Sequence, residues 1–237
     1  MELSVGLANQ VALIAAAFFT SSLAGIVAVG GGILQLAVMA AFLPPASIVP
    51  LHGVVQLVSA STRALFGFRH IEWGILVQFV CGGLIGAYVG SQFVTQMPPE
   101  IIPILLGIII IIVTWMPGIK IETRVHAKFL WLGGIQTFLS LFVGATGPLS
   151  SSVLLREGLQ RDRFVVTHAV LQTTVHLIKV ITFGLIGFLF APYLPLLAGM
   201  VVSVALGSYF GTHLRGKVPE RLFRRVITLL LTILYWQ

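Results

Sequence analysis

Two stretches of this chain combine imidazole, amide and cationic side chains at helical spacing. The first set is His52, Gln56 and Arg63, and the second is His168, Gln172 and Lys179. In both sets the members follow one another after four and then seven residues, a spacing that places them on one face of a helix. Imidazole and amide groups donate hydrogen bonds and the cations supply positive charge, so the two faces suit a small anion. Because ionisable side chains inside apolar segments usually face the bundle interior, we expect both faces to line a transport pathway.

Other interpretations of the same side chains stay open. Arg63 and Lys179 lie near predicted helix ends, where a long cationic side chain can extend to the membrane interface. The histidine and glutamine side chains could instead join neighbouring helices by hydrogen bonds. His176 lies beside the second set. The histidines that we expect to lie away from the pathway, at loops or span ends, are His70, His126 and His213.

A glycine-rich break precedes each polar face. The first break is Gly30, Gly31 and Gly32, and the second runs from Gly144 to Gly147 and Pro148. Non-helical backbone inside a membrane is tolerated only where protein or a water-filled cavity satisfies its amides, so both breaks should face the interior. Proline suits the start of a helix, which would leave the amides of Leu149, Ser150 and Ser151 free at its N-terminus. A helix N-terminus attracts anions through such amides and its positive dipole end.

Close helix packing is the competing explanation for glycine in these segments. We apply it to two pairs with four-residue spacing, Gly86 with Gly90 and Gly207 with Gly211. For the two breaks we favour a ligand role, because they recur at equivalent points of the two halves of the chain.

The elements that carry these residues occur twice. Residues 27–66 correspond to 143–182 at a constant offset of 116, and residues 86–98 correspond to 207–219 at an offset of 121. Two apolar units broken by glycine at the same point are typical of transporters whose site lies between their repeats. We therefore predict an all-α integral membrane protein with one transport domain, formed by inverted repeats of about four hydrophobic segments each. The predicted repeats are residues 1–118 and 119–237.

The composition requires a membrane. Of the 237 residues, 57% are hydrophobic and only 9% are charged, so the chain cannot cover itself with a water-compatible surface. The apolar runs are continuous rather than alternating, which favours helices over a barrel. The net charge of +7 is placed as a topology signal rather than as a nucleic-acid-binding patch. A single cysteine excludes an internal disulfide and a cysteine-based metal cluster within one chain, and we expect no metal.

The lysines and arginines indicate the orientation of the two repeats. If the first segment of each repeat is a glycine-broken or re-entrant hairpin, all twelve loop charges fall on one face, which should be cytoplasmic. The connections near residues 44–45, 97–99 and 191–193 lack Lys and Arg, whereas their equivalents carry them, so the repeats should have inverted topology. Residues 6–29 are long enough to cross obliquely, and whether they span fully or form half of a hairpin stays open.

The glycine breaks and the segment from Thr167 to Lys179 resemble those of the TauE/SafE family of sulfite and organosulfonate exporters. The resemblance covers nearly the whole chain. It implies a multi-pass permease in the plasma membrane of a bacterium or archaeon, which moves small sulfur anions such as sulfite or sulfonates. It implies a transporter rather than an enzyme, with no cofactor and with the lipid bilayer and an anion as its partners. A homodimer stays open.

The chain lacks a nucleotide-binding loop, so we expect a secondary transporter that works by alternating access at the repeat interface. Two alternatives remain. His52 and His168 on facing helices could ligate a haem iron, which would make the protein a membrane redox protein. The pathway could also be an anion channel, which would not show saturation or counterflow.

Overall fold

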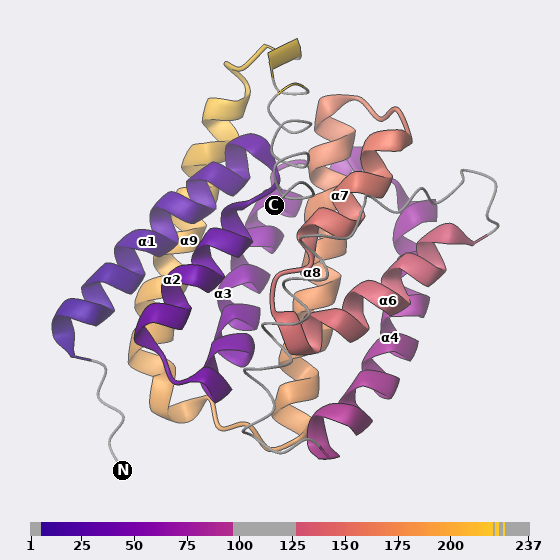
Figure 1. The fold of residues 1–237 in the computed structure, drawn as a ribbon. Helices are drawn as coiled ribbons and strands as arrows, with labels where there is room; N and C mark the ends of the chain where they lie inside the picture. Colours follow the sequence, from indigo (N-terminus) through magenta and orange to yellow (C-terminus); the bar gives the residue numbers. More distant parts are fainter. Residues whose placement is uncertain (1–5, 97–126, 220, 223–224, 226–237) are drawn as a thin grey trace.

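The computed structural model describes residues 6–96, 127–219, 221–222 and 225 of the chain. All regular structure in this part is helical, which confirms the all-α prediction (Figure 1). The α-helices are α1 (Leu7–Val27), α2 (Gly31–Phe42), α3 (Pro45–Leu65), α4 (Trp73–Gln96), α6 (Lys128–Val143), α7 (Gly147–Arg156), α8 (Arg161–Leu185) and α9 (Leu194–Arg215). Short 3₁₀ turns, Phe68–His70 and Ala191–Tyr193, precede α4 and α9.

Several helices are long and apolar enough to cross a membrane. Four candidate spans lie among the described residues: Leu7–Val27, Trp73–Val94, Arg161–Leu185 and Ala191–Arg215. The 21 residues of α1 make roughly 31 Å at 1.5 Å per residue, which is close to the thickness of a hydrocarbon core. The two helices that follow the glycine breaks are much shorter, with 12 residues in α2 and 10 in α7. The protein is therefore a multi-pass membrane protein in which α1 can span fully and α2 cannot.

The helix boundaries recur at the offsets read from the sequence. Helices α2 and α7 begin at residues 31 and 147, and α3 and α8 begin at 45 and 161, a difference of 116 in each case. Helices α4 and α9 begin at 73 and 194, a difference of 121. The helix before each glycine break also ends at a residue with a positive φ. This residue is Ala28 (φ 69°) after α1 and Gly144 (φ 80°) after α6.

Helices α3 and α8 run in opposite directions through the middle of the bundle and contact each other (Figure 1). Helix α1 packs on α9 at one side, and α4 packs on α6 at the other. Both side pairs approach through glycine. A Cβ on Gly207 would overlap the backbone of Phe18, and one on Gly86 would overlap the backbone of Gly134. This confirms that Gly86 and Gly207 serve close helix packing.

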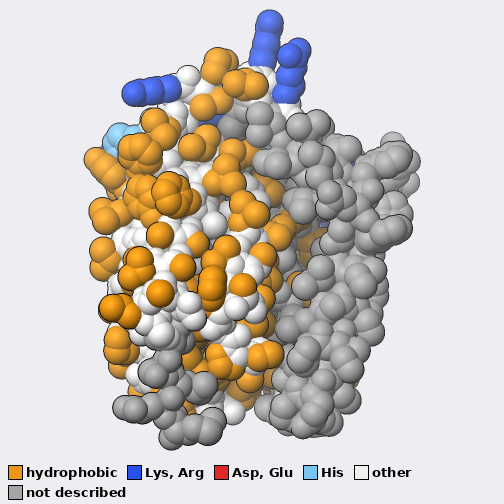
Figure 2. Space-filling model, turned by 60° about the vertical axis from the view of Figure 1, so that its left-hand side comes forward, with side chains coloured by type: hydrophobic (Ala, Val, Ile, Leu, Met, Phe, Trp, Pro, Cys, Tyr) orange, Lys and Arg blue, Asp and Glu red, His pale blue; other side chains and the backbone are white. Residues whose placement is uncertain are grey.

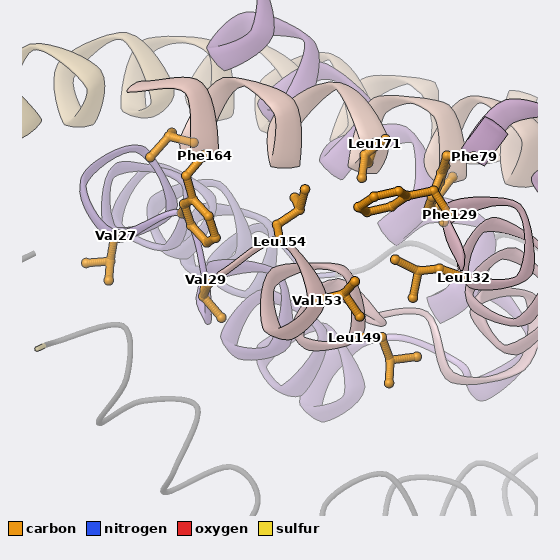
Figure 3. Close-up of a cluster of buried hydrophobic side chains, with 13 residues drawn as sticks. Val27, Val29, Phe79, Phe129, Leu132, Leu149, Val153, Leu154, Phe164 and Leu171 are labelled. Carbon is orange, nitrogen blue, oxygen red and sulfur yellow. The ribbon is translucent and has the colours of Figure 1, made fainter. Parts of the chain in front are cut away.

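The short helix α7 is anchored by a hydrophobic cluster (Figure 3). Leu149, Val153 and Leu154 on α7 belong to the same buried cluster as Phe164 and Leu171 on α8. The cluster also includes Val27 and Val29 at the first break, Phe79 on α4, and Phe129 and Leu132 on α6. A common core therefore fixes the second break relative to the helices around it.

One end of the molecule carries the connections 66–72, 157–160 and 216–219, and we call it the charged end. Figure 2 shows Lys and Arg side chains at this end and mainly hydrophobic side chains on the flank below it. The ion pairs among the described residues at this end include Arg163 with Glu72 (2.7 Å), Lys128 with Glu157 (2.5 Å), and Asp162 with both Arg161 (3.6 Å) and Arg215 (3.7 Å). Of the twelve predicted loop charges, Lys120, Arg124 and Arg224 lie outside the described residues. The connection 118–126, for which the charges predict a cytoplasmic position, also lies outside the described residues.

Candidate functional site

A small cavity lies where the two glycine breaks face α3 and α8. Nine of the predicted site residues line it: Gly30, Gly32, His52, Gln56, Arg63, Gly147, Pro148, His168 and Gln172. Residues from both halves of the chain thus meet at one place. His176 and the small or apolar residues Ala24, Ala28, Val29, Ile33 and Ala145 complete the lining.

Two of the cavity histidines, His52 and His168, each join a long helix to the short helix before it. The Nε2 atom of His52 on α3 lies 2.9 Å from the carbonyl oxygen of Gly32 in α2. The Nε2 atom of His168 on α8 lies 3.2 Å from the carbonyl oxygen of Gly147 in α7. A carbonyl oxygen only accepts hydrogen bonds, so in both contacts the histidine donates through Nε2. The Nδ1 atom of His52 is buried and has no partner among the described residues.

The two glutamines lie against the first turns of the short helices. Gln172 donates from Nε2 to the hydroxyl oxygen of Ser150, at 2.8 Å. A Cβ placed on Gly147 would lie 3.7 Å from Oε1 of Gln172, and one placed on Gly32 would lie 3.5 Å from Oε1 of Gln56. Both glycines therefore leave open the space between the short helix and its glutamine.

The two buried cations have different environments. Arg63 is 3% exposed and lines the cavity, and its Nη1 atom has no hydrogen-bond partner among the described residues. Lys179 is fully buried, does not line the cavity, and donates from Nζ to the carbonyl oxygen of Gly144 at 2.6 Å. The described acidic residues, Glu72, Glu157 and Asp162, pair with cations at the charged end. Within the described chain, no carboxylate neutralises Arg63 inside the cavity.

The short helices present their N-termini to the cavity. In α2 the first intrahelical bond runs from the amide of Leu34 to the carbonyl of Gly30. The amides of Gly31, Gly32 and Ile33 precede that bond and have no partner within the helix. Helix α7 begins at Gly147, one residue earlier than the predicted Pro148, and Pro148 carries no N–H.

Four predicted site residues do not line the cavity: Gly31, Leu149, Ser150 and Lys179. A Cβ on Gly31 would overlap the carbonyl oxygen of Thr20, so this glycine allows α2 to pack against α1. The amide of Leu149 donates to the carbonyl of Thr146 at 3.2 Å and is not free in this arrangement. Ser150 is fully buried and contacts two lining residues, Gln172 and the carbonyl of Gly147.

His176 is a cavity residue that the predicted site leaves out. Its ring centroid lies 5.7 Å from that of His52. The equivalent position in the first half is Ala60, so comparison of the two halves gives no signal. The spacing of His168, Gln172 and His176 at intervals of four residues would have placed it on the same helical face. His70 and His213 lie away from the cavity, and His126 lies outside the described residues.

A sequence model of one protein family, described as "Sulfite exporter TauE/SafE", matches residues 13–236. No curated protein and no solved structure matches the chain. The family match includes both glycine breaks, both polar faces and every residue that lines the cavity. Members of this family are membrane transporters and not enzymes. On a match that extends over nearly its whole length, the chain belongs to the sulfite exporter TauE/SafE family.

Proposed function

We propose that this protein is a secondary transporter that exports a small sulfur-containing anion, such as sulfite or an organosulfonate, through the cavity between its two glycine breaks. The observation that carries this proposal is the Arg63 side chain, which is buried, lines the cavity and has no partner for its Nη1 atom among the described residues. A buried cation without a protein partner is costly, and a bound anion would remove that cost.

The surroundings of Arg63 favour an anion over other ligands. The free amides at the start of α2 add hydrogen-bond donors and the positive end of a helix dipole. Gln56, Gln172 and the histidines supply further polar groups. No described acidic residue lines the cavity, so nothing in the described lining would favour a cation. Family membership supplies the sulfur chemistry.

We infer that the protein consists of two inverted repeats, residues 1–118 and 119–237, which form one transport domain. The recurrence of helix boundaries at offsets of 116 and 121 supports this arrangement. The helix contacts support it too. If each helix is replaced by its equivalent in the other half, the contacting pair α1–α9 becomes the pair α6–α4, whose members also contact each other. Helix α1 begins at the end opposite the charged end (Figure 1). Helix α6 begins at Lys128, which pairs with Glu157 at the charged end, as inversion requires.

The first helix and the short helix after it fit the proposed glycine-broken hairpin in each repeat. In Figure 1, α1 runs towards the charged end and α2 returns from it. Placing the charged end in the cytoplasm satisfies the positive-inside rule. The membrane would be the plasma membrane of a bacterium or archaeon, and a homodimer would be compatible with the apolar flank seen in Figure 2.

The alternatives predict different behaviour. Nε2 of both His52 and His168 contacts a backbone carbonyl, so a bis-histidine haem would have to bind through Nδ1 of each ring and would give a Soret band. Family membership favours transport over redox chemistry. An anion channel would conduct without saturation or counterflow, and this distinguishes it from the transporter proposed here.

The test is flux of sulfite, thiosulfate, sulfoacetate and a carboxylate control into proteoliposomes. We expect saturable uptake of at least one sulfur anion, with counterflow. Arg63→Gln should weaken its apparent affinity by about tenfold or more, the factor expected for one charge-assisted hydrogen bond. Arg69→Gln is the matched control, because Arg69 is exposed at the charged end and should have no effect. Wild-type affinity in a folded Arg63→Gln protein would place the anion elsewhere.

A further inference from the structure

The cavity is asymmetric with respect to the two halves of the chain. Ala24, Ala28 and Arg63 line it on the side of the charged end. At the offset of 116, their equivalents in the second half are Ser140, Gly144 and Lys179. None of these three lines the cavity, and both Ser140 and Lys179 are fully buried. The cavity therefore extends beside Arg63 and does not reach Lys179, and we call these the open side and the closed side.

The closed side is held by one hydrogen bond from a buried ammonium group. Lys179 Nζ donates to the carbonyl oxygen of Gly144, at 2.6 Å. Gly144 follows the last residue of α6 and adopts a left-handed conformation (φ 80°). A cation at the carbonyl end of a helix is favourable because of the helix dipole and the unpaired carbonyls there. Leu36 packs over Gly144, because a Cβ there would lie 2.9 Å from Leu36 Cδ1.

The open side has an equivalent helix end and an equivalent cation, but within the described residues no hydrogen bond joins them. Ala28 follows the last residue of α1, also in a left-handed conformation (φ 69°). Its amide donates to the carbonyl of Ala24 at 2.9 Å, as the amide of Gly144 donates to Ser140 at 3.1 Å. Arg63, the equivalent of Lys179, lines the cavity, and within the described part of the chain its Nη1 atom has no partner. The first break thus carries a cation and a helix end that match those of the second break.

We propose that Lys179 is a positioning residue that latches the second break shut in this state, and that Arg63 forms the equivalent latch with the Ala28 carbonyl in the state open to the opposite side. This inference rests on the alternating access of the proposed function. In each state one cation bonds a helix end and the other faces the anion. The two cations exchange these roles when the protein changes state. Lys179 is then an anion ligand of the opposite state only.

The exchange has a physical reason in the charge of the cavity. Two unpaired cations in one small cavity would repel each other, and each would lack a partner. When one of them donates to a backbone carbonyl, only the other is left unpaired to bind a single small anion. Because Lys179 lies on a helix that runs opposite to α3 (Figure 1), moving the free charge from Arg63 to Lys179 moves it away from the charged end.

The latch can be tested without any substrate. Single cysteines replace Ala24 or Ser140 in a Cys81→Ala background, and their reaction with an impermeant thiol reagent is measured from each side of oriented vesicles. Lys179→Met should raise labelling at position 140 from the opposite side by about tenfold and lower labelling at position 24, because one charge-assisted hydrogen bond is lost. Arg63→Met should change both rates in the opposite directions. Lys179→Arg should restore the wild-type pattern.

Lys217→Met is the matched control, because Lys217 is exposed at the charged end and should change neither rate. If Lys179→Met does not fold, the Arg63→Met variant alone decides, since it must raise labelling at 24 and lower it at 140. Unchanged rates in the folded variants, or changes of the same sign, would overturn the latch. This result would leave the transport proposal intact, because that proposal is tested separately by the anion affinity of the Arg63→Gln variant.

Discussion

At the scale of single residues, the glycines of the first break have two separate roles. Gly32 faces Gln56 across the cavity lining, with room for a small side chain. Gly31, the preceding residue, allows α2 to pack against α1, because a Cβ there would overlap the carbonyl oxygen of Thr20. In the second break, Gly147 faces Gln172 as Gly32 faces Gln56. Binding and packing are therefore assigned to adjacent residues.

These roles predict opposite effects for alanine substitutions. Gly147→Ala and Gly32→Ala should leave the protein folded but weaken anion binding about tenfold, because the methyl group occupies cavity space. Gly31→Ala should lower the free energy of unfolding by about 1–3 kcal/mol through overpacking, with little change in affinity once folded. Thermal unfolding in detergent and anion binding on the same samples measure both. A stable Gly31→Ala protein with lost binding would assign Gly31 to the ligand instead.

At the scale of helices, the two halves are held together by different chemistry. Ser21 on α1 lies 2.9 Å from Ser59 on α3 and 2.6 Å from Ser208 on α9, measured between hydroxyl oxygens. Ser59 and Ser208 are themselves 3.1 Å apart. The positions equivalent to these serines in the opposite repeat are Thr137, Val175 and Ala87. A hydroxyl cluster thus joins α1, α3 and α9 across the two repeats, whereas only Thr137 carries a hydroxyl at the equivalent positions, and it has no partner among the described residues.

The serine cluster should contribute measurably to stability. Ser208→Ala removes contacts to two hydroxyls and to the carbonyl of Ser59, and should lower the free energy of unfolding by about 1 kcal/mol, the scale of interhelical hydrogen bonds in membranes. Ser61→Ala is the control, because its hydroxyl bonds only the carbonyl of Leu57 in its own helix. Equal melting temperatures for the two variants would show that the cluster adds nothing.

At the scale of the whole molecule, charge and apolar surface separate cleanly. Lys and Arg side chains gather at the charged end, and the flank is apolar over the height of the bundle (Figure 2). The connection from residue 186 to residue 193 lies at the other end and contains no Lys or Arg. The molecule therefore has one orientation that satisfies the positive-inside rule.

This orientation predicts which loops are reached from each side of the membrane. A cysteine at Gln160, between α7 and α8, should react with an impermeant reagent only from the cytoplasm. A cysteine at Leu189, which is exposed between α8 and α9, should react only from outside. Both are made in the Cys81→Ala background and labelled in intact cells and in inverted vesicles. Labelling of position 160 in intact cells would contradict the topology.

The sequence was sufficient for the helices and for most of the cavity lining, because both depend on local patterns. Glycine breaks and four-residue spacing are visible in one stretch of chain, and they placed His52, Gln56 and Arg63 correctly at the cavity. The different environments of Arg63 and Lys179 were not predictable, because these two residues occupy equivalent positions at the offset of 116. The contacts of Ser21 and Ser208 with Ser59 were missed, since these serines meet only through tertiary packing.

The unpaired guanidinium of Arg63 has a practical consequence for any measurement on this protein. A buried cation accessible from a cavity attracts every small anion in the buffer, and chloride is usually the most abundant. Chloride should then compete with the transported anion at the same group, so apparent affinities would weaken as the chloride concentration rises. Buffers that contain little chloride would come closest to the intrinsic affinity.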